Sequence, residues 1–178
     1  MKRIIFISLI VISLLICSQG VVVAKATKIA VLWDAFAIPL EPIEPPQLWF
    51  DEAGNVHFHE FDVGGDFNVV STNSGATLDF HGYRIVEVYG QRRLIDGYYR
   101  GYIHGPVTVY EEQGGDVAFV GHMHAYTEQS ESGHFFADGE IILHGVGVYK
   151  GIQLKLDVGQ DSPIHYLGAG QLLNAHGE

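Results

Sequence analysis

Cysteine is almost absent from this chain of 178 residues, in which Cys17 is the only one. It lies in the apolar N-terminal segment, so removal of that segment leaves no thiol. A disulfide framework, a thiolate nucleophile and a cysteine-ligated zinc site are then excluded. Ile16 precedes Cys17, which argues against a lipid-modified cysteine because lipid attachment needs a small residue there. The folded protein must therefore depend on an ordinary packed core.

Basic residues are also scarce. The chain has 10 Lys and Arg against 21 Asp and Glu, a net charge of −11 with histidine neutral. Without residues 1–26, which hold Lys2, Arg3 and Lys25 and no acidic residue, seven basic residues face 21 acidic ones, a net charge of −14. Such a surface repels phosphate backbones and anionic membranes, so we expect no nucleic-acid partner and no peripheral membrane binding.

Two motifs of catalytic or nucleotide-binding proteins are missing as well. The sequence has no G-x-S-x-G motif and no glycine-rich phosphate loop that opens a helix, so nothing supports nucleophilic catalysis. Helical periodicity is missing too, apart from a short helix that we expect at residues 171–174. These absences leave an all-β protein with few obvious chemical groups.

The N-terminus has the anatomy of a secretory signal peptide. Lys2 and Arg3 precede an apolar run over residues 4–17, and Ala24, Lys25 and Ala26 form an A-x-A cleavage pattern. We therefore expect a signal peptide at residues 1–26 and a secreted or cell-envelope location. The alternative is an uncleaved membrane anchor, because residues 4–24 approach the roughly 20 residues that a spanning helix needs.

Residues 27–46 are expected to form an N-terminal extension. Residues 28–34 are apolar enough for a first strand or for a remnant of the export segment, and residues 39–46 read PLEPIEPP. Proline removes backbone donors and restricts its neighbours, so this stretch is predicted to be an extended linker or strap. The main domain is expected to span residues 47–178.

Within that domain, apolar and polar residues alternate with a period of two, which is typical of β-strands. Turn signals separate these runs at intervals close to the 8–12 residues expected of a sandwich or barrel. The predicted strands cover residues 56–63, 83–89, 98–104, 107–111, 117–127, 141–149 and 152–158. The predicted turns lie at residues 53–55, 64–66, 73–75, 96–97, 114–116 and 138–139.

The positions of the glycines favour a barrel over a sandwich. Many of the 22 glycines fall inside strand runs, where glycine marks bends, bulges or close backbone approach. Gly145, Gly147, Tyr149 and Gly151 would share one face of one strand, and a stripe without Cβ atoms permits strong coiling. We expect a closed or nearly closed antiparallel β-barrel of about eight strands. A β-sandwich or jelly roll is the alternative.

The segment at residues 135–156, FFADGEIILHGVGVYKGIQLKL, resembles a strand pair near the end of allene-oxide-cyclase and dirigent-type barrels. Gly145, Gly147 and Tyr149 match its G-x-G-x-[FY] pattern, and Gly151 opens the turn. The resemblance implies a barrel that holds a small apolar molecule in its lumen. It transfers no catalytic residue, because the motif reflects barrel geometry.

His122, His124 and Glu128 give the spacing H-x-H-x3-E. Residues i and i+2 of a strand point to the same side, and imidazole with carboxylate suits a divalent metal. The spacing resembles the first half of the cupin metal motif, but the second half is missing, and His144 or His104 would have to replace it. The alternative is that these histidines line a polar lumen or face water. No other cofactor is expected.

Tyr98, Arg100, Tyr102 and His104 alternate onto one face of a predicted strand. Tyrosines line many ligand cavities, and Arg100 among them could bind a carboxylate. With Tyr149 they form the predicted ligand-binding set. The alternative is ordinary cross-strand packing with Arg100 reaching solvent.

Three functions remain open at this point. The first is an exported β-barrel that binds, or isomerises, a small apolar molecule. The second is a cupin-like metal-dependent enzyme that uses the H-x-H-x3-E motif. The third is a non-catalytic surface protein, which predicts a barrel filled by its own side chains. Whether the protein is an enzyme, and its oligomeric state, stay open.

Overall fold

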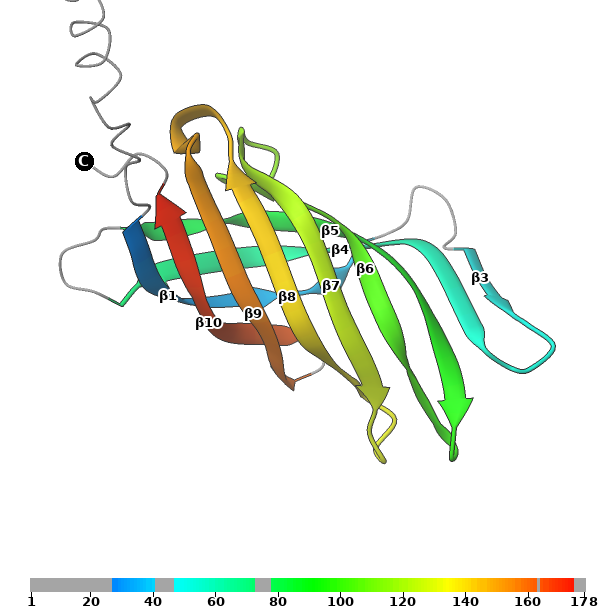
Figure 1. The fold of residues 1–178 in the computed structure, drawn as a ribbon. Helices are drawn as coiled ribbons and strands as arrows, with labels where there is room; N and C mark the ends of the chain where they lie inside the picture. Colours follow the sequence, from blue (N-terminus) through cyan, green and yellow to red (C-terminus); the bar gives the residue numbers. More distant parts are fainter. Residues whose placement is uncertain (1–26, 41–46, 73–77, 163, 175–178) are drawn as a thin grey trace, which may run out of the picture.

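The computed structural model describes residues 27–40, 47–72, 78–162 and 164–174, and these residues form a closed antiparallel β-barrel (Figure 1). The expected signal peptide and residues 41–46 of the Pro-rich stretch lie outside the described residues. The elements are β1 (Thr27–Phe36), β2 (Ile38–Pro39), β3 (Gln47–Phe50), β4 (Val56–Ser71), β5 (Asp79–Ile95), β6 (Tyr98–Tyr110), β7 (Val117–Gln129), β8 (Phe135–Gly145), the 3-10 helix η1 (Gly147–Tyr149), β9 (Ile152–Ser162) and β10 (His165–Asn174). No described helix is long and apolar enough to cross a membrane.

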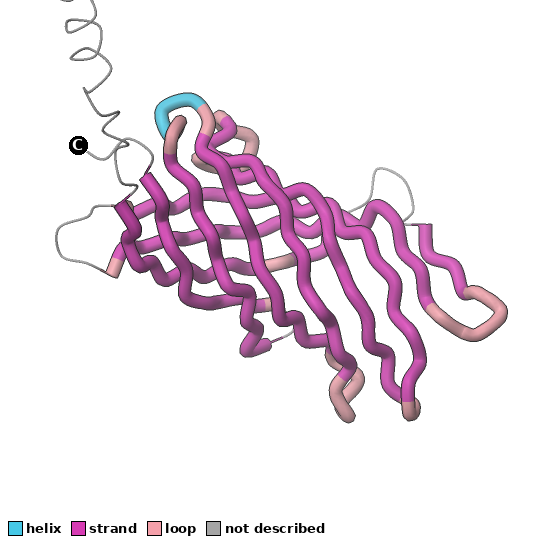
Figure 2. Tube along the Cα trace, viewed as in Figure 1, coloured by secondary structure: helices cyan, strands magenta, loops and turns pink. Residues whose placement is uncertain are grey.

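Eight strands close the barrel. Neighbours pair in the order β1-β10-β9-β8-β7-β6-β5-β4, and β4 pairs back with β1. Figure 2 shows that strand makes up nearly all of the described chain. The predicted all-β class and the eight-stranded barrel are therefore confirmed. The expected domain start near Gln47 does not mark the start of the barrel, because β1 fills the gap between β10 and β4.

Alternation places one set of side chains inside the barrel and the other outside. The largest inward side chains are less than 2 % exposed, and each contributes roughly 1.5–3 kcal/mol through burial of apolar surface. They fill the middle of the barrel: Phe67, Phe119, Ile141, Leu143, Leu154 and Leu156. Along the outward face of β6 and β7, every second residue is correspondingly exposed or half-buried.

The β5–β6 hairpin follows the predicted turn. Ile95 pairs with Tyr98 across the two residues Asp96 and Gly97, which have φ angles of 52° and 87°. Positive φ at both central residues is the geometry that suits the twist of a two-residue hairpin. Asp-Gly is one of the few sequences that adopts it at low cost.

Two other predicted turns are wrong. Residues 64–66 lie inside β4 and residues 138–139 lie inside β8. At Gly65 an added Cβ would meet the carbonyl oxygen of Phe36, and at Gly139 it would meet the backbone of β7. These glycines allow close approach of neighbouring strands and do not reverse the chain.

The C-terminal part differs from the prediction at two places. The strand expected over residues 141–149 ends at Gly145, and Gly147–Tyr149 form η1, so Gly147 and Tyr149 do not extend its face. The short helix expected at residues 171–174 is wrong, because these residues belong to β10. Gln171 pairs there with Ala30 and Lys155.

Candidate functional site

The outer face of β5, β6 and β7 carries two neighbouring sets of aromatic rings in contact. Tyr89 stacks on His104 with ring centroids 5.9 Å apart, and His104 stacks on His122 at 6.1 Å. Tyr102 stacks on His124 at 5.6 Å and meets Tyr126 edge-on at 5.2 Å. Register explains this placement, because His104 pairs directly with His124 and Tyr102 with Tyr126.

A groove of about 750 Å³ lies on this outer face. It is lined by Tyr89, Gly90, Gln91, Arg93, Ile95, Arg100, Gly101, Tyr102, His104 and Tyr126. Tyr102 is 57 % exposed, so much of its surface is in contact with water. The groove is mainly apolar and aromatic with a few polar groups, which is the composition of small-molecule sites.

Three members of the predicted ligand-binding set, Arg100, Tyr102 and His104, line this groove. Tyr98 lies in an adjacent depression of about 410 Å³, which Arg100 and Glu128 also line. The four residues share one face of β6, as their alternation predicted, and this face is outside the barrel.

Tyr149 is separate from the other four. It follows β8 in η1 and packs against Phe119 at 5.0 Å and edge-on against Phe80 at 5.6 Å. Burial raises the pKa of its hydroxyl, with a further contribution from the negative charge of Glu111. Its contacts are those of a residue that closes the apolar core, so the predicted set divides between two places.

Arg93 and Arg100 face each other across the β5–β6 ladder at the edge of the groove. Arg100 Nη2 donates to Glu128 Oε1 at 2.9 Å, whereas Arg100 Nε is buried without a hydrogen-bond partner. Arg93 is exposed and has no carboxylate partner among the described residues. Two guanidinium groups directly opposite each other on one face are unfavourable unless anions compensate them.

The predicted metal residues lie on the same outer face but do not converge. His122 and His124 are both exposed on one side of β7, whereas Glu128 is bound to Arg100. His144 pairs with Val120 rather than with either histidine. Over the described ranges, no three His, Cys, Asp or Glu residues lie close enough to hold a metal ion.

The barrel interior holds a cation, Arg84, that was not among the predicted site residues. Arg84 is 2 % exposed, and its Nε has no hydrogen-bond partner in the described structure. Its guanidinium carbon lies 5.8 Å from the Trp33 ring centre and 5.3 Å from that of Tyr166. Burial lowers the pKa of Arg84 to about 10.

Arg92 also points inward, nearer the β5–β6 hairpin. Its Nε donates to Thr127 Oγ1 at 3.1 Å, and its guanidinium carbon lies 3.8 Å from the centre of the Phe135 ring. Burial lowers the pKa of Arg92 to about 10. Arg84 and Arg92 inside the barrel and Arg93 and Arg100 at the groove are four of the chain's ten basic residues.

The β3–β4 hairpin projects beyond the barrel (Figure 1). Trp49 stacks on His57 with ring centroids 5.2 Å apart. Asp51 accepts hydrogen bonds from the Asn55 side chain and from backbone amides of the turn, and its carboxylate lies 3.2 Å from His57 Nε2. These hydrogen bonds, chiefly from Asn55, lower the pKa of Asp51 to about 2.

Sequence reasoning missed Tyr89, Gln91, Arg93 and Tyr126 as groove residues. The alternation of β5 and β7 carries the signal that could have found them, because these residues share parity with Glu87 and His124. Alternation within a strand does not predict the register between strands, which brings these residues of β5, β6 and β7 together. Comparison of the chain with protein-family models, curated proteins and solved structures finds no match.

Proposed function

We propose that the protein is an exported β-barrel that binds a small, flat, mainly apolar molecule in the groove on the outer face of β5–β7. The observation that carries the proposal is the groove of about 750 Å³ lined by Tyr89, Tyr102, His104 and Tyr126. Flat ligands stack on such rings, and offset or edge-on aromatic contacts are worth about 0.5–1.5 kcal/mol each beyond burial. The proposal concerns binding and includes no chemical step.

The outer groove is a better candidate than the middle of the lumen. Phe67, Phe119 and Leu154 occupy that part of the barrel and are less than 2 % exposed. A ligand there would have to displace several such side chains, each at a cost of roughly 1.5–3 kcal/mol of burial. The groove needs no such rearrangement.

Direct titration with 2-naphthamide, a neutral bicyclic aromatic, tests the proposal. The fluorescence anisotropy of 2-naphthamide is expected to rise and saturate with wild-type protein. Tyr102→Ala should weaken binding at least fivefold, because it removes the ring that contacts both His124 and Tyr126.

Leu32→Ala is the matched control. Leu32 lies on β1 and, like Tyr102, is 57 % exposed, but it does not line the groove. The affinity of the Leu32→Ala variant for 2-naphthamide should equal that of the wild type. Absence of saturable binding to the wild type, or an equal loss in both variants, would exclude the groove as the site and favour a non-catalytic surface protein.

A further inference from the structure

The groove contains a pair of like charges. Arg93 on β5 is the register partner of Arg100 on β6, and both residues line the groove. Among the described residues that line it, none carries a carboxylate. Glu128, beside it on β7, can compensate only one of the two positive charges.

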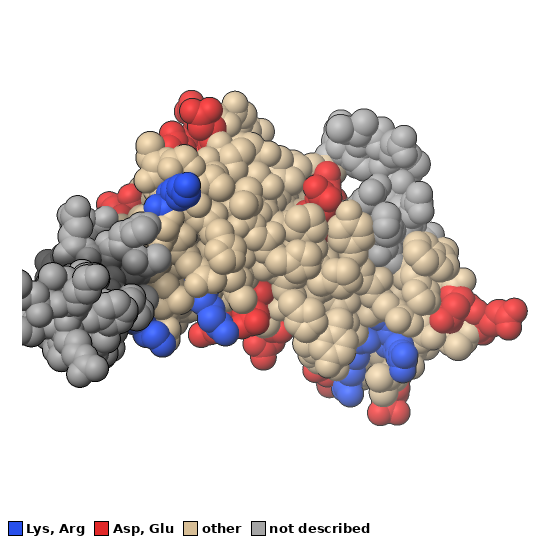
Figure 3. Space-filling model, turned by 45° about the horizontal axis from the view of Figure 1, so that its top comes forward, with Lys and Arg blue, Asp and Glu red and all other residues tan. Residues whose placement is uncertain are grey.

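This placement is unusual for a chain with a net charge of −11. Figure 3 shows acidic and basic groups as separate spots on a visible face that is otherwise mostly uncharged. Cross-strand pairs of like charge cost stability, so two adjacent arginines need a compensating anion. Glu128 contacts only Nη2 of Arg100, and Arg93 has no carboxylate beside it among the residues that line the groove.

The distance between the charges and the rings indicates the size of that anion. Tyr102 follows Arg100 by two residues on the same face of β6, and a strand rises about 3.4 Å per residue, so their Cα atoms are about 7 Å apart. A flat ring on Tyr102 with an anionic group roughly one ring away would reach both arginines. Guanidinium groups bind planar carboxylates through paired hydrogen bonds.

We infer that the ligand of the groove is an aromatic carboxylate, with its ring stacked on Tyr102 and its carboxylate held between Arg93 and Arg100. This inference rests on the proposed function. It adds the charge of the ligand and the residues that recognise that charge. Glu128, the register partner of Arg100 on β7, forms an ion pair with that guanidinium. Arg93, exposed and without a described carboxylate partner, supplies the charge that the ligand neutralises.

The test compares two ligands of the same shape and different charge at pH 8, 2-naphthoate and 2-naphthamide. Wild-type protein should bind 2-naphthoate at least tenfold more tightly. Arg93→Gln should reduce this preference about tenfold, the equivalent of about 1.4 kcal/mol. The preference should also fall as salt is added, because the arginines are close to solvent.

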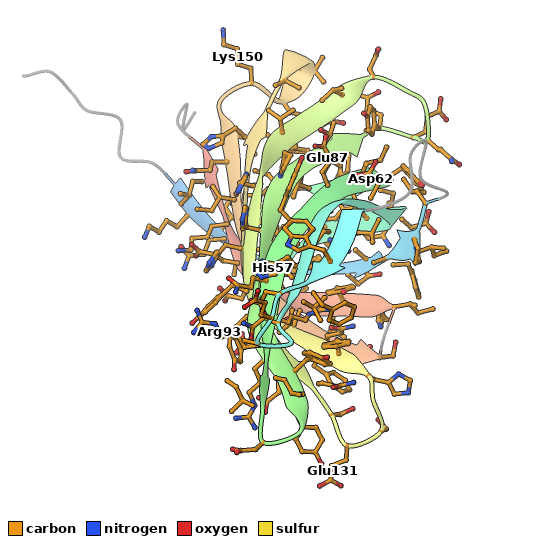
Figure 4. All side chains as sticks on the ribbon, turned by 90° about the vertical axis from the view of Figure 1, so that its right-hand side faces the viewer. His57, Asp62, Glu87, Arg93, Glu131 and Lys150 are labelled. Atoms are coloured by element: carbon orange, nitrogen blue, oxygen red, sulfur yellow. The ribbon has the colours of Figure 1, made fainter. Side chains whose placement is uncertain are left out.

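Lys150→Gln is the control, since it removes the same charge from an exposed residue. Figure 4 shows Lys150 at the end of the molecule opposite Glu131 and well separated from Arg93. Its preference for 2-naphthoate should match the wild type, and equal urea midpoints of both variants would establish that they are folded.

The outcomes separate the two proposals. Equal affinity for the amide and the carboxylate, or a carboxylate preference that survives Arg93→Gln, overturns the carboxylate inference and leaves the binding groove standing. Failure of both ligands to bind overturns both proposals. A tenfold preference that is lost in Arg93→Gln and kept in Lys150→Gln supports both.

Discussion

Arg84 offers a direct test of the energetics of the barrel interior. At neutral pH its guanidinium is charged and buried, with the rings of Trp33 and Tyr166 as its nearest cation–π partners. Burial lowers the pKa of Arg84 to about 10, which corresponds to a desolvation cost of roughly 3 kcal/mol at 1.36 kcal/mol per pH unit. Each cation–π contact at this distance returns on the order of 1 kcal/mol.

Arg84→Met keeps an unbranched side chain of similar length and removes the charge. Methionine sulfur also makes favourable contacts with aromatic rings, worth about 0.3–1.5 kcal/mol. The free energy of unfolding at pH 7 should therefore rise by about 1–2 kcal/mol. Urea denaturation followed by tryptophan fluorescence measures this change as a higher midpoint at constant slope.

The dependence on pH has a definite sign. Because the pKa of Arg84 is lower in the folded state, the unfolded chain binds the proton more tightly. Stability is therefore gained as the pH rises above about 10, where the folded protein loses this proton before the unfolded chain does, and the full cost is present at pH 7. Arg84→Met should abolish that part of the pH dependence.

Lys155→Met is the control for Arg84→Met. Lys155 lies outside the barrel, half-exposed, in an ion pair with Glu140 at 2.8 Å, and its loss should change stability by no more than about 0.5–1 kcal/mol. If Arg84→Met lowers the free energy of unfolding by more than about 1 kcal/mol, the reasoning fails, since the guanidinium would then be stabilising the interior.

Three other predictions concern the fold. Leu154→Ala should lower the free energy of unfolding by about 2–5 kcal/mol and Leu32→Ala by less than about 0.5 kcal/mol in urea denaturation, because only Leu154 lies inside the barrel; equal losses would contradict the two-faced sheet. Gly105→Ala should cost about 1–3 kcal/mol in the same assay, because its Cβ would collide with a carbonyl oxygen of β5, and an unchanged midpoint would show that the strands are not so close. The depressed pKa of Asp51 means that its contribution to the hairpin is present above pH 3.8 and is lost as the pH falls through about 2; the Asn55 amide resonance should titrate near pH 2, and a midpoint near 3.8 would refute the hydrogen-bonded turn.

Alternation was enough to predict much of the fold. It placed Tyr98, Arg100, Tyr102 and His104 on one face of a strand, and His122 and His124 on one face of the next. The structure has these side chains on the outer surface. The Asp96-Gly97 turn was also readable, because few dipeptides adopt positive φ at both positions.

Glycine was the main source of error. Gly65 and Gly139 resemble turn residues in the sequence, but each lies mid-strand, where a neighbouring backbone leaves no room for a Cβ. Whether a glycine turns the chain or permits close packing depends on the neighbouring strand, which the local sequence does not identify. The same limit applies to β1, whose place in the barrel depends on pairing with β10 and β4.

The site residues likewise divide into those that alternation predicts and those whose place depends on a neighbouring strand. The parity of Arg84 matches that of Val86 and Val88, which are buried, but arginine almost never lies inside a core, so parity and residue type disagree there. The facing pair Arg93 and Arg100 follows from the tight turn between their strands. The aromatic groove also needs β7 in register with β6, which alternation alone leaves undetermined.

Contacts between protons of bound 2-naphthamide and protein side chains, measured as intermolecular nuclear Overhauser effects, test the central claim most directly. We expect contacts with the rings of Tyr102 and Tyr126 and none with the methyl groups of Ile141 and Leu154. Contacts with those methyl groups in place of the tyrosine rings would move the ligand into the lumen and contradict the account.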